Sequence, residues 1–372
     1  MNFDFSEDQK LVQKTARDYL DEQSGLDVCR AVLESGKPYD TDLWKGIAEM
    51  GWLGVAVDEV HGGAGMGYLE LVLIAEEVGR ALAPIPFASS VYLCTEAIQR
   101  FGSPEQQKKY LPRLVAGEVI GTGAFFEGPG DLDASTIELK LQDGKLDGEK
   151  WPVPDGDVAG LAVALAQDGQ GRLSMVLVDL EGDGVTKTSL GSIDPSRSQA
   201  KLRFEAAPAE LLGEPGRGWD QTEALLDRAA LLLSFEQIGG AERALEITKE
   251  QTMGRYAFGR PVASFQAIKH RMADLYCAIE IARSNAYYGA YALSNDLAEE
   301  LAVAAPSARS AASDAFDLAG QEMIQFHGGV GFTWEYDCHL FYRRAKALSV
   351  ALGSPAAWRE KLIARLEARE AQ

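Results

Sequence analysis

The stretch Gln325-Phe-His-Gly-Gly-Val-Gly331 joins two helical patterns and decides how the C-terminal third of the chain folds. Apolar residues recur at helical spacing over residues 310–324, and a second helical pattern covers residues 341–351. Gly328, Gly329 and Gly331 permit backbone angles that side chains exclude, so the main chain can approach a ligand closely. Amides in such a turn suit a phosphate, but an ordinary helix C-cap uses the same residues. The turn therefore predicts either a helix end or an anion site.

A second patch favours the anion site. It contains cations, aromatic planes and a side-chain amide, in the segments Arg255-Tyr-Ala-Phe258-Gly259, Phe265-Gln266 and Lys269-His270. Cations bind a pyrophosphate and aromatic planes stack on a purine. Together with the glycine turn, this patch predicts a site for the nucleotide end of a dinucleotide.

Charge limits the classes of partner. The chain has 372 residues and a net charge of −20, so we expect no nucleic-acid binding, which needs a basic face. The same charge disfavours anionic membrane surfaces. An anionic ligand must be met by local clusters, such as Arg255 with Arg260, or Arg343 and Arg344 with Lys346.

The cysteines and the N-terminus indicate a cytoplasmic protein. The four cysteines are widely spaced and form no Cys-x-x-Cys pair, so we expect neither a metal site nor a disulfide framework. The first residues, Met-Asn-Phe-Asp-Phe-Ser-Glu-Asp, have neither the apolar core of a signal peptide nor an Arg-rich transit segment. Because there is no run of about 18 apolar residues, we expect no membrane span.

Periodicity divides the chain into three parts, giving an α+β fold class. Residues 1–115 are predicted to be helical, with helix starts at Ser6, Asp40 and Ser103 and a glycine-rich connection over residues 61–67. Residues 116–219 are predicted to form a small β barrel or sandwich, with strands over residues 137–141, 161–165, 173–180 and 201–204. Residues 220–372 are predicted to form a bundle of long helices interrupted at Gly239-Gly240, Pro306 and the glycine turn. Strands and helices do not alternate, which argues against a Rossmann domain.

In this order and spacing, four motifs give the whole chain a resemblance to the acyl-CoA dehydrogenase family. They are Gly-Gly-Ala-Gly-Met-Gly67-Tyr-Leu-Glu-Leu, Leu212-Gly-Glu-Pro-Gly-Arg-Gly-Trp219, Arg255-Tyr-Ala-Phe-Gly-Arg-Pro261 with Phe265-Gln266, and Gln325-Phe-His-Gly-Gly-Val-Gly-Phe-Thr-Trp-Glu-Tyr336. The resemblance implies an N-terminal helical domain, a middle β domain and a C-terminal four-helix bundle. It also implies FAD as cofactor, an acyl-CoA thioester as substrate, tetrameric assembly through the bundles, and electron-transfer flavoprotein or a similar acceptor.

The resemblance assigns the nucleotide end of FAD to specific residues. Arg255 and Phe258 would contact this tail, with Gln266 close by. Gln325, Gly328 and Gly329 would hold it from the neighbouring chain.

The part of the family pattern that surrounds the flavin ring is different here. Where relatives have a Thr-Glu-Pro-Gly-Ala-Gly-Ser-like loop, this chain has Phe126-Glu-Gly-Pro-Gly-Asp-Leu132, without the first hydroxyl and with an added carboxylate. Where relatives have Trp-Ile-Thr, it has Pro152-Val153-Pro154, and proline has no N–H. A shift by one residue would put Trp151 in the place of the indole, but the hydroxyl would still be absent. We therefore expect that the chain does not enclose its own flavin ring.

The catalytic base also departs from the commonest pattern. Many relatives place a glutamate where this chain has Leu352, which cannot accept a proton. A minority place the base on another helix just before an arginine, a position occupied here by Asp227 before Arg228. Asp227 is either that base or a structural partner of Arg228 or another cation, since burying a lone carboxylate is costly. Weaker candidates are Glu335, His270, His327 and His339; of these, His327 would touch the FAD tail.

Three functions remain open. The first is a flavin-sharing subunit of an α2β2 acyl-CoA dehydrogenase in which a paralogous partner supplies the glutamate. The ending Gly-Phe-Thr-Trp-Glu-Tyr336 with Tyr342-Arg-Arg-Ala-Lys346 resembles enzymes of this type from steroid side-chain degradation, whose half-sites leave room for bulky polycyclic thioesters. The second is a self-sufficient homotetramer with Asp227 as base. The third is a scaffold without flavin contact, which would leave Arg255, Gln325 and the glycine turn without a role.

Overall fold

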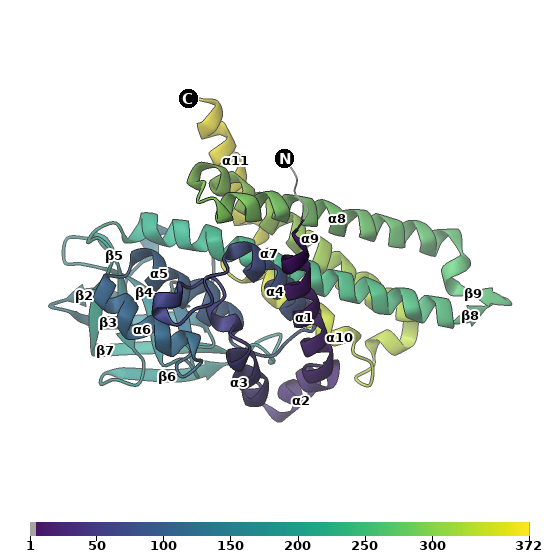
Figure 1. Cartoon of the computed structure of the whole chain (residues 1–372), viewed down its shortest axis with the longest axis horizontal. Coiled ribbons are helices and arrows are strands. Elements are labelled where there is room, and N and C mark those ends of the chain that lie inside the picture. Colours follow the sequence, from purple (N-terminus) through teal and green to yellow (C-terminus); the bar gives the residue numbers. More distant parts are fainter. Residues whose placement is uncertain (1–4, 372) are drawn as a thin grey trace. The chain divides into compact units, whose positions relative to one another are not determined.

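A computed structural model describes residues 5–371 and has helices at both ends of the chain with a β-rich region between them (Figure 1). This order confirms the predicted fold class. The chain folds as two compact units. A helical unit contains Met1–Glu34, Leu69–Ala83 and Ala230–Gln372, and a β-containing unit contains Ser35–Tyr68 and Pro84–Ala229. The division into three domains at residues 115 and 219 stays a prediction.

The β-containing unit is built on a closed sheet. Its strands are β1 (Gly121–Ala124), β2 (Lys140–Gln142), β3 (Lys145–Pro154), β4 (Leu161–Gln167), β5 (Leu173–Asp179), β6 (Val185–Leu190) and β7 (Gln199–Leu212). The pairings β4–β2–β3–β7–β5 return to β4, so the sheet forms a small barrel. β1 lies parallel to β4, and β6 lies antiparallel to β7. β4 is buried along nearly its whole length, as its continuous apolar run requires.

Short helices belong to this unit as well. They are α3 (Thr41–Glu49), α5 (Glu96–Phe101), α6 (Pro104–Val115), the π-helix η3 (Ala88–Thr95) and the 3-10 turns η1 (Trp52–Gly54), η2 (Glu59–His61) and η4 (Ala134–Thr136). Ser103 caps α6 through a reciprocal pair of hydrogen bonds with Gln106, and Asp40 caps α3 by accepting the N–H of Leu43. Both predicted helix starts are therefore confirmed. η3 packs directly on β1, where a Cβ at Gly121 would lie 2.4 Å from that of Cys94.

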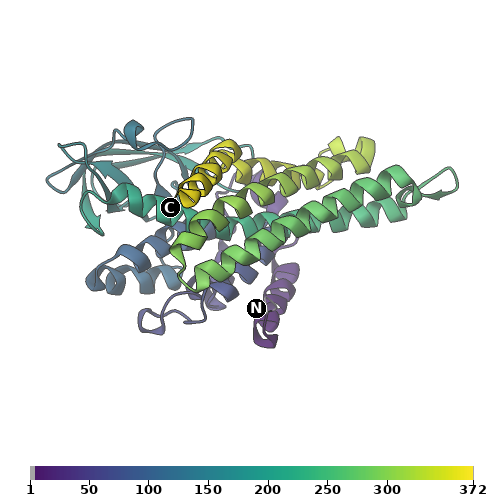
Figure 2. The same ribbon diagram turned by 90° about the horizontal axis from the view of Figure 1, so that it is seen from above.

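The helical unit contains the long helices. They are α1 (Glu7–Gln23), α2 (Leu26–Ser35), α4 (Tyr68–Arg80), α8 (Gln266–Ser294), α9 (Ala298–His327), α10 (Cys338–Val350), α11 (Pro355–Glu370) and, from Ala230 onward, α7 (Gly218–Gly254). α9 packs against α8, α10 and α11. Figure 2 shows α8 and α9 lengthwise beside each other, with a β-hairpin projecting beyond their ends. This hairpin is β8 (Tyr256–Ala257) and β9 (Arg260–Pro261), and it joins α7 to α8.

Two predicted helix interruptions are wrong. α7 runs through Gly239-Gly240, and α9 runs through Pro306. At Gly239 an added Cβ would lie only 1.9 Å from the carbonyl oxygen of Glu76 in α4, and at Gly79 one would lie 1.9 Å from the carbonyl oxygen of Glu236 in α7. These glycines permit two helix backbones to cross closely, so they mark a packing contact within continuous helices.

Between residues 5 and 371, no helix is both long and apolar enough to cross a membrane.

Candidate functional site

The β8–β9 hairpin presents the first group of predicted site residues. At its tip Phe258 has φ +53° and its side chain is 97 % exposed, while Gly259 has φ +76°. Behind the tip, Phe265 meets Phe258 edge-on at 6.4 Å between ring centroids, and the Arg260 guanidinium lies 3.9 Å from the Phe265 centroid. Gln266, which is exposed, begins α8 directly after this cluster. The hairpin thus offers an aromatic plane and a cation to a ligand outside this chain's core.

The glycine turn provides the second group. α9 ends at His327, and Gly328–Phe332 form the 3-10 turn η6, with Gly328 at φ +68°. A Cβ at Gly329 would meet nothing within 4 Å, so the backbone there is open to an incoming group. Gln325 is exposed one turn earlier on α9. Of the two predicted alternatives, a helix end or an anion site, the structure contains the helix end. The main chain beside this helix end is accessible.

Arg255 joins these two groups within one chain. Its Nη1 donates a hydrogen bond to the carbonyl oxygen of His327 at 3.0 Å, and a Cβ at Gly328 would lie 3.2 Å from the same nitrogen. A guanidinium beside an open glycine backbone suits a pyrophosphate, because both supply donors to anionic oxygens. The donor set at this end therefore fits the nucleotide portion of FAD. Which chain of an assembly supplies each contact stays a prediction.

A pocket of ≈ 350 Å³ lies behind the glycine turn, inside the helical unit. Its lining includes His327, Gln251, Glu250, Tyr336 and Cys338. His327 is buried, its Nδ1 lies 2.6 Å from the carbonyl oxygen of Met323, and its ring meets that of Tyr336 edge-on. His327 is therefore held by its own helix, and its backbone carbonyl, rather than its ring, contacts Arg255.

The loop predicted near the flavin ring lies in the β-containing unit and is fixed by internal bonds. Phe126 accepts the N–H of Trp151 at 2.9 Å, and Glu127 accepts the N–H groups of Glu138 and Leu139. Glu127 also forms an ion pair with Lys150 at 2.6 Å.

Four residues beside this loop offer no uncommitted hydrogen-bond donor. Pro152 and Pro154 contribute no N–H, and the Thr122 hydroxyl donates to the carbonyl oxygen of Pro154 at 2.5 Å. The Lys150 ammonium is fully buried and bonds Glu127 and the carbonyl oxygen of Phe125. Burial lowers the pKa of Lys150 to about 8 against the attraction of Glu127. Pro152, Pro154, Thr122 and Lys150 therefore offer no uncommitted N–H or O–H donor to a flavin ring, and whether this chain encloses its own flavin ring stays a prediction.

The two positions considered for a catalytic base differ in chemistry. Leu352 lies in the turn between α10 and α11 with φ +63°, and this turn, Ala351-Leu-Gly-Ser354, contains no carboxylate. Arg309, fully buried in α9, donates to the carbonyl oxygens of Leu348 and Ala351 and so holds the turn in place. Burial lowers the pKa of Arg309 to about 9.

Asp227 is on α7 and only 5 % exposed. Its neighbour Arg228 has a carboxylate partner of its own, because its Nε bonds the buried Glu96, and its guanidinium lies 4.8 Å from the Tyr68 ring centroid. The Tyr68 hydroxyl also donates to Glu96, at 2.9 and 3.0 Å to its two oxygens. Burial and then the charge of Glu96 raise the pKa of Tyr68. Whether Asp227 is a base or a structural partner stays open.

The weaker candidates occupy different surroundings. Glu335 is exposed, and its own backbone N–H followed by Thr333 lowers its pKa. His339 stacks on Trp334 at 4.5 Å between centroids, and burial lowers its pKa. His270 is exposed near the start of α8.

Sequence patterns did not single out Lys150, Arg309 or the group Tyr68, Glu96 and Arg228. Arg309 occupies a buried position of a helix, and Lys150 occupies a buried position of a strand. Apolar residues usually fill such positions, so a charged residue there was the available signal in the sequence. Tyr68 and Glu96 are far from Arg228 in the chain, so only the structure reveals their contact.

Comparison with known proteins agrees with this architecture. The family model "Acyl-CoA dehydrogenase, N-terminal domain" matches residues 6–118, and "Acyl-CoA dehydrogenase, C-terminal domain" matches residues 216–366. Acyl-CoA dehydrogenase IpdE2 of Mycobacterium tuberculosis is 32% identical over 97% of this chain and 96% of its own length. IpdE2 of Mycolicibacterium smegmatis is 31% identical over 98% of this chain and 99% of its own.

Solved structures show the same similarity. A variant of the Tcur3481-Tcur3483 steroid ACAD superposes with a TM-score of 0.90 at 30% identity, covering 98% of this chain and 99% of its own. The ChsE4-ChsE5 complex from Mycobacterium tuberculosis gives a TM-score of 0.88 at 27% identity, covering 99% of both chains. Butyryl-CoA dehydrogenase from Megasphaera elsdenii gives 0.90 at 25% identity over 98% of this chain and 100% of its own. The chain therefore belongs to the acyl-CoA dehydrogenase family, whose members are FAD-dependent oxidoreductases acting on acyl-CoA thioesters.

Proposed function

We propose that this chain is a flavin-sharing subunit of a hetero-oligomeric acyl-CoA dehydrogenase. A paralogous partner subunit supplies the catalytic glutamate, in an α2β2 assembly. The substrate is a CoA thioester with a bulky acyl group derived from a steroid side chain. Electron-transfer flavoprotein or a similar carrier takes up the electrons.

The observation that carries this proposal is the turn at Leu352. α,β-Dehydrogenation requires a group that removes the proton from Cα while a hydride leaves Cβ, and the bound FAD supplies the hydride acceptor. Leucine has no group that can accept the proton. The other residues of this turn, Ala351, Gly353 and Ser354, have no carboxylate. Arg309 holds this turn by two carbonyl oxygens. A carboxylate must therefore come from elsewhere, and the proposal places it on the partner.

The unequal ends of the cofactor site support the same assignment. Arg255, Phe258, Gln266, Gln325, Gly328 and Gly329 would hold the nucleotide end of FAD, with the guanidinium beside the open glycine backbone. At the other end, Pro152 and Pro154 offer no N–H, and the Thr122 hydroxyl already bonds Pro154. With donors at the nucleotide end and few at the ring end, this chain is suited to contribute to a flavin site shared with a partner. It is poorly suited to enclose a whole FAD by itself.

The names of two similar structures support the assembly and the substrate class. Tcur3481-Tcur3483 is described as a steroid ACAD and carries two protein names, and ChsE4-ChsE5 is described as a complex. This chain covers nearly the full length of the matched chain in each.

Purification with and without the acyl-CoA dehydrogenase paralogue encoded beside this chain tests the proposal. We expect the chain alone to lack dehydrogenase activity on a steroid side-chain CoA thioester. We expect the co-purified pair to be active and to contain about one FAD for every two chains. FAD is measured by its absorbance after denaturation, and stoichiometry by native mass spectrometry. A yellow, active protein made of this chain alone, with one FAD per subunit, contradicts the proposal.

A second candidate is a self-sufficient homotetramer in which Asp227 is the base. The specific observation in its favour is a carboxylate buried on α7 beside an Arg228 whose charge is already matched by Glu96. An active protein made of this chain alone that loses activity as Asp227→Asn would establish this alternative.

A further inference from the structure

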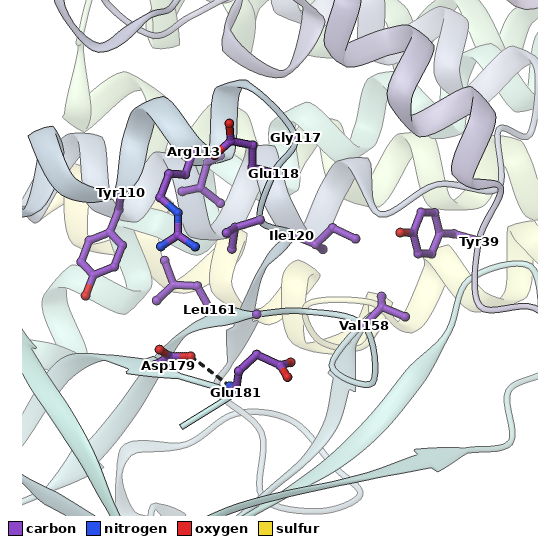
Figure 3. A pocket seen from close by; sticks show the side chains of 13 residues that line it. Tyr39, Tyr110, Arg113, Gly117, Glu118, Ile120, Val158, Leu161, Asp179 and Glu181 are labelled. Atoms are coloured by element: carbon purple, nitrogen blue, oxygen red, sulfur yellow. Dashed lines mark hydrogen bonds between the residues drawn. The ribbon is translucent and has the colours of Figure 1, made fainter. Parts of the chain in front are cut away.

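A pocket of ≈ 420 Å³ in the β-containing unit has no part in the flavin or base positions described above (Figure 3). It lies where α6 leads into β1 and where β4 begins, with the end of β5 opposite. Its volume falls within the range of small-molecule sites, which is roughly 300–1,000 Å³. Within this pocket the lining combines an apolar floor with charges of both signs.

The walls are held by backbone hydrogen bonds. The carbonyl oxygen of Arg113 accepts the N–H groups of Glu118 at 3.0 Å and Val119 at 3.3 Å, which fixes the turn after α6. Ile120 accepts the N–H of Gly160 at 2.9 Å, which joins that turn to β4. The space is therefore bordered by a preformed frame, and a ligand would not have to order it.

The floor of the pocket is aliphatic. Leu114, Ile120, Val158 and Leu161 line it. Of these, Leu114, Ile120 and Leu161 are buried, so their positions are set by the packing beneath them. An apolar group of a ligand placed here would leave water without displacing any charged side chain.

One cation, Arg113, and three carboxylates, Glu118, Asp179 and Glu181, line the pocket. The Glu118 carboxylate lies on the side of Arg113 that faces away from Leu161 (Figure 3). In Figure 3 the Arg113 side chain extends from α6 into the space, while Asp179 and Glu181 lie across it beyond Leu161. Within the described chain, the Arg113 guanidinium forms no ion pair. Asp179 uses one oxygen to accept the N–H of Glu181 at 2.9 Å, and Glu181 pairs with Lys187. Of the charged groups on the Leu161 side of the pocket, Arg113 and Asp179 are therefore the two that a ligand can complete.

We propose that this pocket binds a small zwitterion of the α-amino-acid type with an aliphatic side chain. Its carboxylate pairs with Arg113, its ammonium pairs with Asp179, and its side chain covers the floor of Leu114, Ile120, Val158 and Leu161. A simple anion would meet Asp179 and Glu181, and a simple cation would meet Arg113, so each alone is opposed by a like charge. A zwitterion satisfies both ends, and charge-assisted hydrogen bonds are the strong ones.

L-Leucine is the probe, compared with two derivatives that each lack one charge. N-Acetyl-L-leucine has no ammonium and L-leucinamide has no carboxylate. Calorimetric titration and ligand-observed NMR on the full chain, alone or with its partner subunit, measure binding. We expect L-leucine to bind with a Kd on the order of 1 mM or tighter. Both derivatives should bind at least about tenfold more weakly, since each loses a charge-assisted bond.

Three variants assign the contacts. Arg113→Met should weaken L-leucine about tenfold and leave L-leucinamide nearly unchanged, because leucinamide has no carboxylate to lose. Asp179→Asn keeps an acceptor for Glu181 and should weaken L-leucine while leaving N-acetyl-L-leucine nearly unchanged. Lys108→Met is the matched control, since it removes an exposed cation from the same helix α6 outside the pocket lining.

Three results would overturn the site. One is no L-leucine binding up to about ten times the expected Kd. A second is equal binding of all three compounds, and a third is Arg113→Met binding L-leucine as the unchanged chain does. All these variants change exposed side chains, and a circular-dichroism melt confirms that each protein is folded.

Discussion

Asp227 and Leu352 decide, at the scale of single residues, whether this chain performs proton transfer. Asp227→Asn removes the charge of a buried carboxylate and keeps its size. If the partner supplies the base, we expect kcat of the assembled enzyme to change less than about threefold, whereas loss of a general base costs about a hundredfold or more. Steady-state kinetics on the co-purified complex distinguish these outcomes.

Asp220→Asn is the control for that experiment. Asp220 is in the first turn of the same helix, exposed and paired with Arg217. If Asp227→Asn loses a hundredfold in kcat while FAD content and the Asp220 variant stay normal, Asp227 is the base and the partner is not.

Arg255 carries the second prediction at this scale. Its guanidinium bonds the carbonyl oxygen of His327 and lies beside Gly328, where the FAD pyrophosphate is proposed to bind. Arg255→Met should weaken FAD binding roughly 10- to 100-fold, the usual value of a hydrogen bond to a charged group. Titration of FAD into the deflavinated complex, followed by flavin fluorescence, measures this. Lys249→Met is the control, because it removes an exposed cation of α7 that belongs to no proposed site. Equal losses in both variants would argue against a specific contact.

The crossing of α4 and α7 is the feature to test at the scale of elements. Gly239 lies so close to the carbonyl oxygen of Glu76 that a Cβ would be 1.9 Å away, so Gly239→Ala must push the helices apart. We expect a loss of about 1–3 kcal/mol or more in the free energy of unfolding, measured by denaturant titration. Gly254→Ala, at the open end of the same helix, meets nothing within 4 Å and should be neutral or slightly stabilising. Similar stability of the two variants would refute the close crossing.

Glu76 makes this crossing sensitive to pH. Burial raises the pKa of Glu76 from 4.5 to about 7, against the attraction of Arg283. Because the folded state binds this proton more tightly than the unfolded state, the group's contribution to stability is full below pH 4.5. It is lost as pH rises through about 7.

Glu76→Gln should remove this dependence. Relative to the unchanged chain, the variant should gain roughly 2–3 kcal/mol in the free energy of unfolding between pH 4.5 and pH 8. Arg283 keeps a partner in the variant, because its Nη2 also bonds Glu242 at 3.0 Å. Denaturant titrations at several pH values measure the difference, and parallel pH curves for the two proteins would show that Glu76 is already ionised in the folded state.

Elements were predictable where local chemistry decides them. Ser6 and Ser103 start helices through side-chain bonds to residues three positions later, which the sequence displays directly. The β1, β3 and β6 strands were not predicted. β1 is four small residues, β3 ends in Pro152-Val-Pro154, and β6 is largely exposed, so none shows an apolar alternation. Gly239 and Pro306 were predicted to interrupt helices because the prediction used local helix propensity alone. Tertiary contacts, which propensity does not include, keep α7 continuous through Gly239 and α9 continuous through Pro306.

At the scale of the whole molecule, the sequence predicted the fold class, and it identified the segments of the proposed nucleotide site without showing how these segments meet. The motifs around Arg255 and Gly328 were identified separately, and the bond from Arg255 to His327 brings them together. Contacts between residues far apart in the chain, such as Arg228 with Glu96 or Arg309 with Leu348, leave no periodic signal. The same is true of the pocket between Arg113 and Asp179.

The net charge of −20 leads to the last prediction, because the proposed CoA thioester carries phosphates of the same sign. Raising the salt concentration from about 10 mM to about 100 mM shortens the Debye length from about 30 Å to about 10 Å and screens this repulsion. We expect kcat/KM of the assembled enzyme to rise several-fold, roughly 2- to 10-fold, through faster association. The matching pantetheine thioester has no phosphates and should show little change. If kcat/KM for the CoA thioester falls with salt instead, local cations such as Arg255 and Arg260 outweigh the charge of the chain, and attraction guides the substrate in.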